Sequence, residues 1–137
     1  MMCRGVRGAT VVGSDSQEEI LLWTRRLLTL IVRTNDIDPA DITSILFTTS
    51  DLSAEFPAMA ARQIFKEHSI PLLCAQELQV PRAVSNCVRV LLHWNTDKPQ
   101  SEIKAVYING AEKVFQSVVP DYDEEELEAW VNSQLPQ

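Results

Sequence analysis

The sequence predicts a single α+β domain built from five β-strands and two main helices. Its length of 137 residues is that of one domain, and its 45% hydrophobic content can form a core without disulfides or metals. Segments with the two-residue alternation of strands follow segments with the three- and four-residue spacing of helices. Length, composition and this change of period together favour a sheet packed with helices.

The first predicted strand covers residues 3–12. Alternation with a period of two places Gly5, Arg7 and Ala9 on one face, which is small around a single long cation. Such a face either packs against something other than a side chain, or belongs to an edge strand whose arginine is solvated. The pattern alone leaves both alternatives open.

The strongest helix prediction covers residues 16–35. Ser16 and Glu19 have the spacing of a capping box, and apolar residues follow at three- and four-residue steps. We expect the apolar stripe to be buried on the sheet. The arginines of this helix are expected to face water; they are Arg25, Arg26 and Arg33.

The remaining elements are predicted by β-branched runs, prolines and turn residues. Asp38 and Pro39 have the pattern of an N-cap followed by the first position of a short helical turn. Further on, β-branched and apolar runs indicate strands, and Pro57 opens a second helix. The predicted ranges are a strand at 43–49, a helix at 57–66, a strand at 70–75, a turn or short helix at 80–86, strands at 87–95 and 105–108, and a turn at Asn109-Gly110.

The net charge of −7 is concentrated at the C-terminus. Six of the 19 acidic residues follow residue 120, whereas residues 1–120 carry 12 basic and 13 acidic residues. We therefore divide the chain into a folded domain, 1–120, and an acidic C-terminal tail, 121–137. Leu127, Trp130 and Val131 have helical spacing, so the tail is either a short docked helix or, as we favour, a frayed and solvated segment.

Charge, cysteines and histidines argue against several classes of protein. An acidic chain is poorly suited to binding nucleic acid phosphates, and no apolar run reaches the roughly 18 residues that span a membrane. The cysteines, Cys3, Cys74 and Cys87, form no C-x-x-C pair, and the only histidines are His68 and His93. We therefore expect neither a disulfide framework nor a metal centre, and we expect reduced thiols in the cytoplasm.

Arg89 is the most informative residue because it lies in the middle of an apolar strand. A charge in a central strand is costly unless it is paired. Glu77 could be its partner in a purely structural salt bridge. Alternatively, both residues line a pocket, where Arg89 donates to an anionic oxygen and Glu77 accepts from a hydroxyl. The spacing does not choose between these interpretations.

Motifs for covalent, phosphoryl or hydride chemistry are absent from the sequence. It contains no G-x-S-x-G, no phosphate-binding loop, no dinucleotide fingerprint and no H-E-x-x-H. Cys74, Cys87 and His93 alternate with apolar residues, which is more typical of core positions than of nucleophiles or bases. The chain therefore offers charged groups suited to holding a ligand, without a recognisable nucleophile.

Five segments carry a specific combination of residues: 1–10, 56–58 with Arg62, 74–77, 87–90 and 106–108. In this order they resemble the monofunctional chorismate mutases of the trimeric mixed α/β class, of the Bacillus type. The resemblance covers about residues 1–111. It implies a five-stranded mixed sheet packed with helices, a homotrimer that forms a pseudo α/β-barrel, and a catalytic domain over residues 1–120.

The resemblance also implies an activity. The protein would be an isomerase that converts chorismate to prephenate in phenylalanine and tyrosine biosynthesis, with no cofactor and no covalent intermediate. A concerted [3,3] rearrangement needs a held conformer and an electrostatic field matched to its polarised transition state. Two alternatives are a catalytically silent ligand-binding or regulatory subunit on the same trimeric scaffold, and a different small trimeric fold such as a deaminase of reactive enamines.

The resemblance assigns roles to individual residues. Arg89 and Glu77 would be catalytic, with Arg89 at the ether oxygen of the breaking bond and a carboxylate, and Glu77 at the ring hydroxyl. The substrate-binding set would be Arg7 and Tyr107 at the side-chain carboxylate, Cys74 beside Glu77, Phe56, Ala58, Leu72 and Leu73 along the pocket, and Arg62 at its mouth from the partner side.

The chain departs from the family at two places. Met59 stands where the family commonly has a lysine. The family's tail also has an arginine in an L-R-P-D run, where this chain has Val114-Phe115-Gln116 followed by residues 117–121. Lys113 would replace that positive charge only in part. We therefore expect catalysis to survive and substrate capture to weaken, with an effect mainly on KM.

Overall fold

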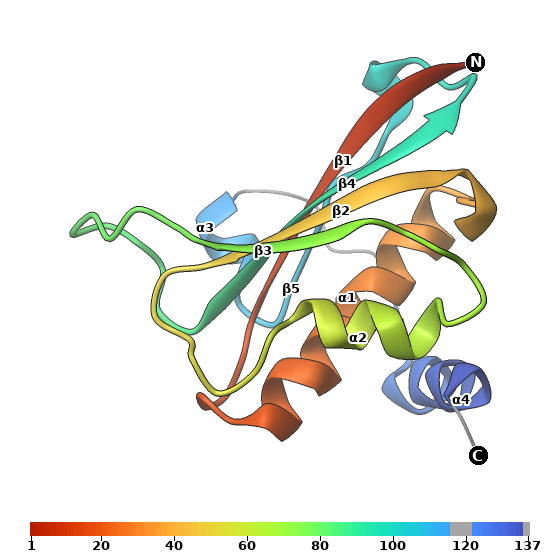
Figure 1. Cartoon of the computed structure of the whole chain (residues 1–137). Helices are drawn as coiled ribbons and strands as arrows, with labels where there is room; N and C mark the ends of the chain where they lie inside the picture. Colours follow the sequence, from red (N-terminus) through yellow and green to blue (C-terminus); the bar gives the residue numbers. More distant parts are fainter. Residues whose placement is uncertain (116–121, 136–137) are drawn as a thin grey trace.

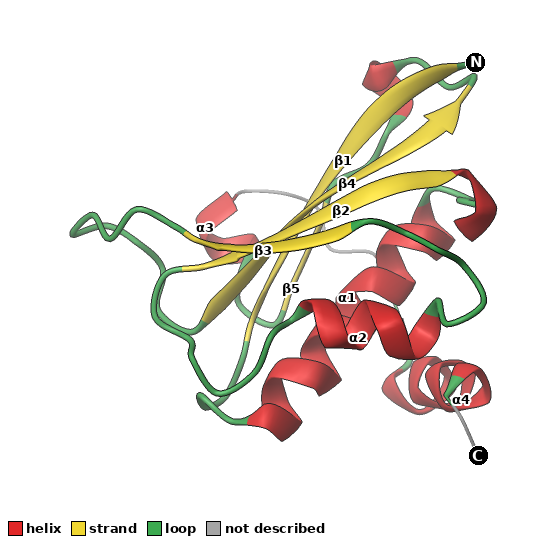
Figure 2. Cartoon of the chain, in the orientation of Figure 1, coloured by secondary structure: helices red, strands yellow, loops and turns green. Residues whose placement is uncertain are grey.

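The computed structural model describes residues 1–115 and 122–135. Within these ranges the chain forms five strands, four α-helices and two short 3-10 helices (Figures 1 and 2). In chain order they are β1 (Met2–Val11), α1 (Gln17–Thr34), η1 (Pro39–Asp41), β2 (Ile42–Thr49), α2 (Ala58–Ile64), β3 (Leu72–Gln76), β4 (Cys87–Thr96), η2 (Gln100–Glu102), β5 (Val106–Ile108), α3 (Glu112–Phe115) and α4 (Glu124–Gln134).

The strands form a mixed sheet in the order β3-β2-β4-β1-β5. The central strand β4 pairs antiparallel with β1 and β2, whereas β1 pairs parallel with β5 and β2 pairs parallel with β3. The predicted α+β class and mixed sheet are thereby confirmed. The predicted strand boundaries lie within two residues of the observed ones.

Helices α1 and α2 lie on one face of the sheet (Figure 1). Gly8 on β1 allows α1 to approach closely, because a Cβ at this position would lie 2.8 Å from the Ile31 Cδ1 atom and 3.0 Å from the Val106 carbonyl oxygen. The apolar residues of the strands that point toward the helices are buried; they are Val6, Ile45, Phe47, Val88, Val90 and Leu92. This face holds the main core, and no long helix of the described residues covers the opposite face of the sheet, which we call the open face.

Helix α1 begins at a cap that differs in one detail from the predicted capping box. The Ser16 side chain accepts a hydrogen bond from the Glu19 backbone N–H at 3.3 Å, as expected. The Glu19 carboxylate accepts instead from the Gly13 N–H at 2.8 Å, because the chain before the cap turns back toward the helix. At the other end, the Asn35 side-chain amide donates to the Ile31 carbonyl and closes the last turn.

The favoured prediction of a frayed C-terminal segment is wrong for residues 124–134. They form α4, which contacts α1 and α2 (Figure 1). The Asp123 side chain caps the helix by accepting from the Glu126 N–H at 2.9 Å. Leu127 and Val131 are completely buried. The helix is stable in place because its apolar stripe removes surface of α1 and α2 from water.

Docking of α4 also changes the environment of one arginine on α1. Arg26 was expected to face water, but only 9% of it is exposed. Its Nε donates to Glu128 at 2.5 Å, and its guanidinium lies 4.6 Å from the centroid of the Trp23 ring. Arg33 pairs with Glu126 at the surface, at 3.0 Å. The acidic face of α4 therefore contacts the basic face of α1.

Residues 80–86 were predicted to form either a turn or a short helix. The structure shows turns and no helix in the whole segment between β3 and β4, residues 77–86 (Figure 1). Asn86, the last residue of this segment, adopts the left-handed conformation, with a φ angle of 53°.

Among the described residues, no helix combines the length and the apolar character needed to cross a membrane.

Candidate active site

The open face of the sheet carries three of the predicted site residues in neighbouring strands. Ala9 on β1 is opposite Arg89 on β4 and opposite Tyr107 on β5, so these residues form one row across the sheet. Arg7 lies two positions from Ala9 and therefore points to the same face. Since β1 lies between β4 and β5, it is not an edge strand. Arg7 therefore lies on an interior strand, and its side chain is exposed on the open face of the sheet.

Arg89 and Glu77 form the predicted pair. Arg89 Nη1 donates to Glu77 Oε1 at 2.6 Å. Glu77 follows β3, and its backbone N–H donates to the Thr49 carbonyl at 3.0 Å, which holds the carboxylate near β4. Side-chain exposure is 49% for Arg89 and 23% for Glu77. The pair is therefore a salt bridge at the surface of one chain. Among the described residues only Nη1 of Arg89 donates a hydrogen bond, so its other N–H groups can donate to a ligand.

Both residues also line a cavity, so the salt bridge and the pocket coexist. The cavity has a volume of about 270 Å³ and lies on the open face of the sheet. A second cavity of about 510 Å³ lies on the other side of the pair, toward residues 78–84. The first cavity is lined by Arg7, Gly8, Leu46, Thr48, Glu77, Arg89, Val90, Leu91 and Tyr107. Two arginines, a carboxylate and a phenol thus converge on one space that suits a small anion with hydroxyl groups.

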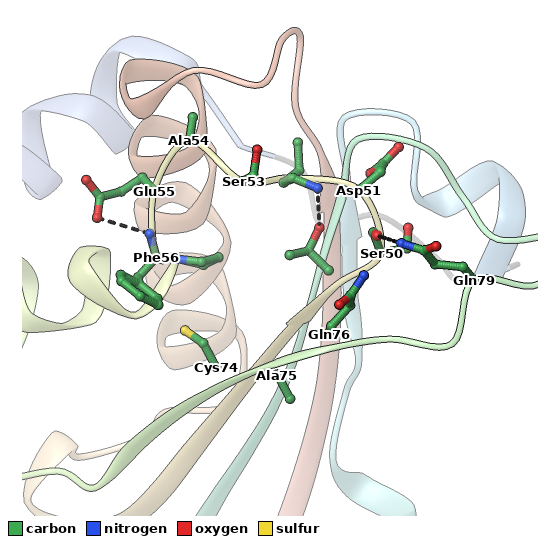
Figure 3. A pocket seen from close by; sticks show the side chains of 13 residues that line it. Ser50, Asp51, Ser53, Ala54, Glu55, Phe56, Cys74, Ala75, Gln76 and Gln79 are labelled. Carbon is green, nitrogen blue, oxygen red and sulfur yellow. Dashed lines mark hydrogen bonds between the residues drawn. The ribbon is translucent and has the colours of Figure 1, made fainter.

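Residues around Phe56 and Cys74 form a separate group at the outer strand of the sheet (Figure 3). They line a cavity of about 540 Å³ between residues 49–57 and β3. The Cys74 sulfur points toward Phe56, whereas Ala75 points away (Figure 3). Burial raises the pKa of the Cys74 thiol, an effect that a hydrogen bond from the Ala58 backbone partly offsets. Cys74 is therefore a neutral, packed thiol.

The other predicted substrate-binding residues lie on the elements that also carry the Phe56 and Cys74 group, or next to them. Ala58 is half-buried at the start of α2, and Leu73 is 60% exposed on β3. Arg62 and Leu72 line a further cavity of about 340 Å³ at the end of α2. One chain therefore brings together Arg7, Glu77, Arg89 and Tyr107, but it does not bring the Phe56 group to them.

Cys87 and His93 were predicted to be packed residues and not a nucleophile or a base, and their positions agree with this. Burial, followed by the charge of Glu77, raises the pKa of Cys87 to about 12, so its thiol stays protonated at neutral pH. His93 is half-buried, and its Nδ1 lies 3.2 Å from the Ser44 hydroxyl. Neither residue is placed as a nucleophile or a base.

Several residues at the site were not singled out from the sequence. Leu46, Thr48 and Leu91 line the Arg89 cavity. The alternation of the strands at 43–49 and 87–95 could have found them, because it places them on the face that carries Arg89. Phe115 lies beside Arg89 and Tyr107, but no local pattern predicts this. The departure noted at Gln116 lies outside the described residues.

The segment 50–57, which carries Phe56, is held to the start of α1 by Asp15. The Asp15 carboxylate accepts from the backbone N–H groups of Ser53 and Ala54, at 3.1 and 2.9 Å, and from the Ser53 hydroxyl at 3.1 Å. These hydrogen bonds lower the pKa of Asp15 from its ordinary value of 3.8, and the bond from the Ala54 N–H has the largest effect. The tether is therefore at full strength above that value and is lost as the pH falls through the lowered pKa.

We expect Asp15→Asn to loosen residues 50–57 at neutral pH, because a neutral amide cannot accept all three hydrogen bonds. Hydrogen exchange of this segment should become faster. If the segment contributes to ligand binding, KM should rise several-fold with little change in kcat. The control is Asp36→Asn, at the opposite end of α1. Unchanged exchange at residues 50–57 in Asp15→Asn would contradict the tether.

Comparisons with known proteins show which proteins the chain is similar to. The family model described as chorismate mutase type I matches residues 3–117. Chorismate mutase AroH of Bacillus subtilis (strain 168) is 42% identical over 109 residues, covering 79% of this chain and 86% of the relative. Chorismate mutase AroH of Thermus thermophilus is 44% identical over 112 residues, covering 80% and 91%.

A solved structure supports the same relationship. The chorismate mutase from Clostridium thermocellum has a TM-score of 0.76 and 43% identity, covering 80% of this chain and 97% of that one. Helix α4 lies beyond the residues that the family model matches. The family model, the two relatives and the solved structure lead to one conclusion: the chain belongs to the chorismate mutase type I family.

Proposed function

We propose that this isomerase converts chorismate to prephenate by electrostatic stabilisation of the transition state in the cavity beside Arg89. The observation that carries the proposal is the convergence of Arg7, Glu77, Arg89 and Tyr107 on that cavity. Chorismate has two carboxylates, a ring hydroxyl and an ether bond that breaks as a carbon–carbon bond forms. Its rearrangement needs no nucleophile, because the electrons move in one cycle within the substrate.

Arg89 is the leading catalytic residue in this mechanism. Negative charge grows on the ether oxygen as its bond to the ring carbon lengthens, and a guanidinium can donate to that oxygen and to a carboxylate together. The 2.6 Å bond to Glu77 holds one edge of the guanidinium before substrate arrives. The field is therefore set in advance, and little reorganisation is needed in the transition state.

The other residues hold chorismate in its reactive conformer. Glu77 accepts a hydrogen bond from the ring hydroxyl, and Arg7 and Tyr107 bind the side-chain carboxylate. These contacts keep the two reacting carbon atoms close together, which lowers the entropic part of the barrier. Arg62 supplies positive charge at the mouth of the cleft, where Met59 offers none.

The complete cleft is proposed to form between subunits of a homotrimer, in which three sheets face inward as a pseudo α/β-barrel. Exposed apolar side chains on the open face of the sheet support this, including Leu73 at 60% and Leu91 at 38% exposure. Phe56 is 68% exposed, although an aromatic side chain normally packs against other atoms. In the assembly, the Phe56 group of one protomer would close the Arg89 cavity of its partner, together with Cys74, Ala58, Leu72 and Leu73.

Mixing two inactive variants tests the shared cleft. Arg89→Ala removes the catalytic cation, and Phe56→Asp places a carboxylate where a dianionic substrate would pack. Each mixed ring of three then has one intact cleft, so random mixing restores about a quarter of the wild-type activity. Each variant alone is the control, with prephenate formation followed by absorbance.

Other outcomes would contradict parts of the proposal. A solution mass near one chain, or trimers that regain no activity on mixing, would place the whole site in one protomer. Wild-type protein that binds prephenate without turning over chorismate would be the silent ligand-binding subunit. We further propose a cytoplasmic location, supported by the free thiols of Cys3, Cys74 and Cys87.

A further inference from the structure

Phe115 is the one aromatic residue that contacts both Arg89 and Tyr107 in the described part of the chain. After β5, Asn109 and Gly110 adopt positive φ angles of 53° and 101°, and this turn folds α3 back over the sheet. The Phe115 ring stacks on Tyr107 with a centroid separation of 4.9 Å and an interplanar angle of 21°. The Arg89 guanidinium carbon lies 5.2 Å from the centroid of the same ring.

The geometry points to Phe115 as a positioning residue that orients the Arg89 guanidinium and the Tyr107 ring for the rearrangement. This inference rests on the roles proposed above for Arg89 and Tyr107. Phe115 acts through these two side chains and is not assigned a contact with the substrate.

The two contacts on Arg89 have different geometry and therefore complement each other. Glu77 binds one edge of the guanidinium through Nη1, whereas Phe115 attracts the cation through its π face. A half-exposed arginine held by a single hydrogen bond could still rotate about that bond. The second contact restricts this rotation and also covers part of the cation against water. Arg89 then needs less reorganisation to meet the ether oxygen.

The surroundings of Phe115 argue against a role in overall stability alone. It packs on a small cluster formed by Ala9, Cys87, Tyr107 and Ala111, on the opposite side of the sheet from α1 and α2. It also lines the 510 Å³ cavity, which Glu77 and Arg89 line as well. Loss of its ring therefore disturbs the site before it disturbs the main core.

Substitutions that separate aromatic character from volume test the inference. We expect Phe115→Leu to lower kcat/KM about tenfold, because leucine keeps an apolar side chain but lacks the π face that holds Arg89. Phe115→Tyr should retain nearly all activity, because it keeps the ring. Val114→Ala, at a neighbouring residue that is 51% exposed, is the control and should behave as wild type. Melting temperatures of all three variants are measured alongside activity.

A double-mutant cycle tests whether Phe115 acts through Arg89. In an Arg89→Ala background no cation faces the Phe115 ring, so Phe115→Leu should then change kcat/KM by a much smaller factor. An equal factor in both backgrounds would overturn the inference, as would full activity in Phe115→Leu. The inference would also be overturned if Phe115→Leu and Phe115→Tyr lost equal activity and their melting temperatures fell by matching amounts. If Arg89→Ala itself kept full activity, the proposed site would fail rather than this inference alone.

Discussion

Arg89→Ala should lower kcat/KM for chorismate by about 100-fold or more, which corresponds to roughly 3 kcal/mol or more of lost transition-state stabilisation. The effect should fall mainly on kcat, because the charge on the ether oxygen develops only as the bond breaks. A neutral isostere of arginine at this position should show a similar loss. Steady-state kinetics, with chorismate loss followed by absorbance, measure both constants.

Two further variants show what the guanidinium contributes. Arg89→Lys keeps the charge but cannot donate to two oxygens at once, so we expect it to be poorly active. Arg82→Ala removes an arginine that lines the neighbouring cavity, and its activity should stay close to wild type. If Arg82→Ala lost as much as Arg89→Ala, general positive charge would explain the catalysis. Nearly normal kcat in Arg89→Ala, in a folded protein, would exclude the proposed mechanism.

Leu127→Ala should lower the free energy of unfolding by about 2–5 kcal/mol, which is the usual range for a leucine truncated in a packed core. Leu127 is completely buried, and the cavity left behind would lie beneath α4, where it docks on the neighbouring helices. Denaturant unfolding at one temperature measures the change. The value of kcat should be unaffected below the unfolding transition, because α4 and the Arg89 cavity lie on opposite faces of the sheet.

The matched control for Leu127→Ala is Glu125→Ala on the same helix. Glu125 is exposed, so its truncation should change the free energy of unfolding only slightly. An unfolding curve of Leu127→Ala that matches that of Glu125→Ala would show that α4 does not dock in solution. A large fall in kcat for Leu127→Ala would instead show that α4 is coupled to the site.

The local patterns of the chain predicted those parts of the site that depend on a single element. Alternation in residues 87–95 places Arg89 and Leu91 on one face, and the structure keeps both on the open face. The turn residues Asn109 and Gly110 correctly predicted the reversal after β5. Phe115 was not predicted, because its contacts depend on how α3 folds back after that turn. Short elements carry too little periodicity to reveal such contacts.

The C-terminal segment shows that local patterns also failed to predict one part of the core. The spacing of Leu127 and Val131 allowed a helix, but the acidic composition favoured a solvated segment. The outcome depended on whether a partner surface existed, and α1 and α2 provide one with Arg26 and Arg33 beside it. Composition describes a segment alone, whereas docking depends on the complementary charge and apolar area of another element.

By itself the sequence determined the order of strands and helices, the faces that carry apolar and charged side chains, and the resemblance to one family of isomerases. Only the tertiary structure decided that β4 lies between β1 and β2. This strand order brings Arg7 to Arg89, although more than 80 residues of chain separate them, and it brings Glu77 to Arg89 across about a dozen residues. It also decided that Arg26 is buried and that Phe115 lies against Arg89. The reason is physical: periodicity depends on neighbours along the chain, whereas strand order and docking depend on contacts between distant segments, whose free energies no local pattern contains.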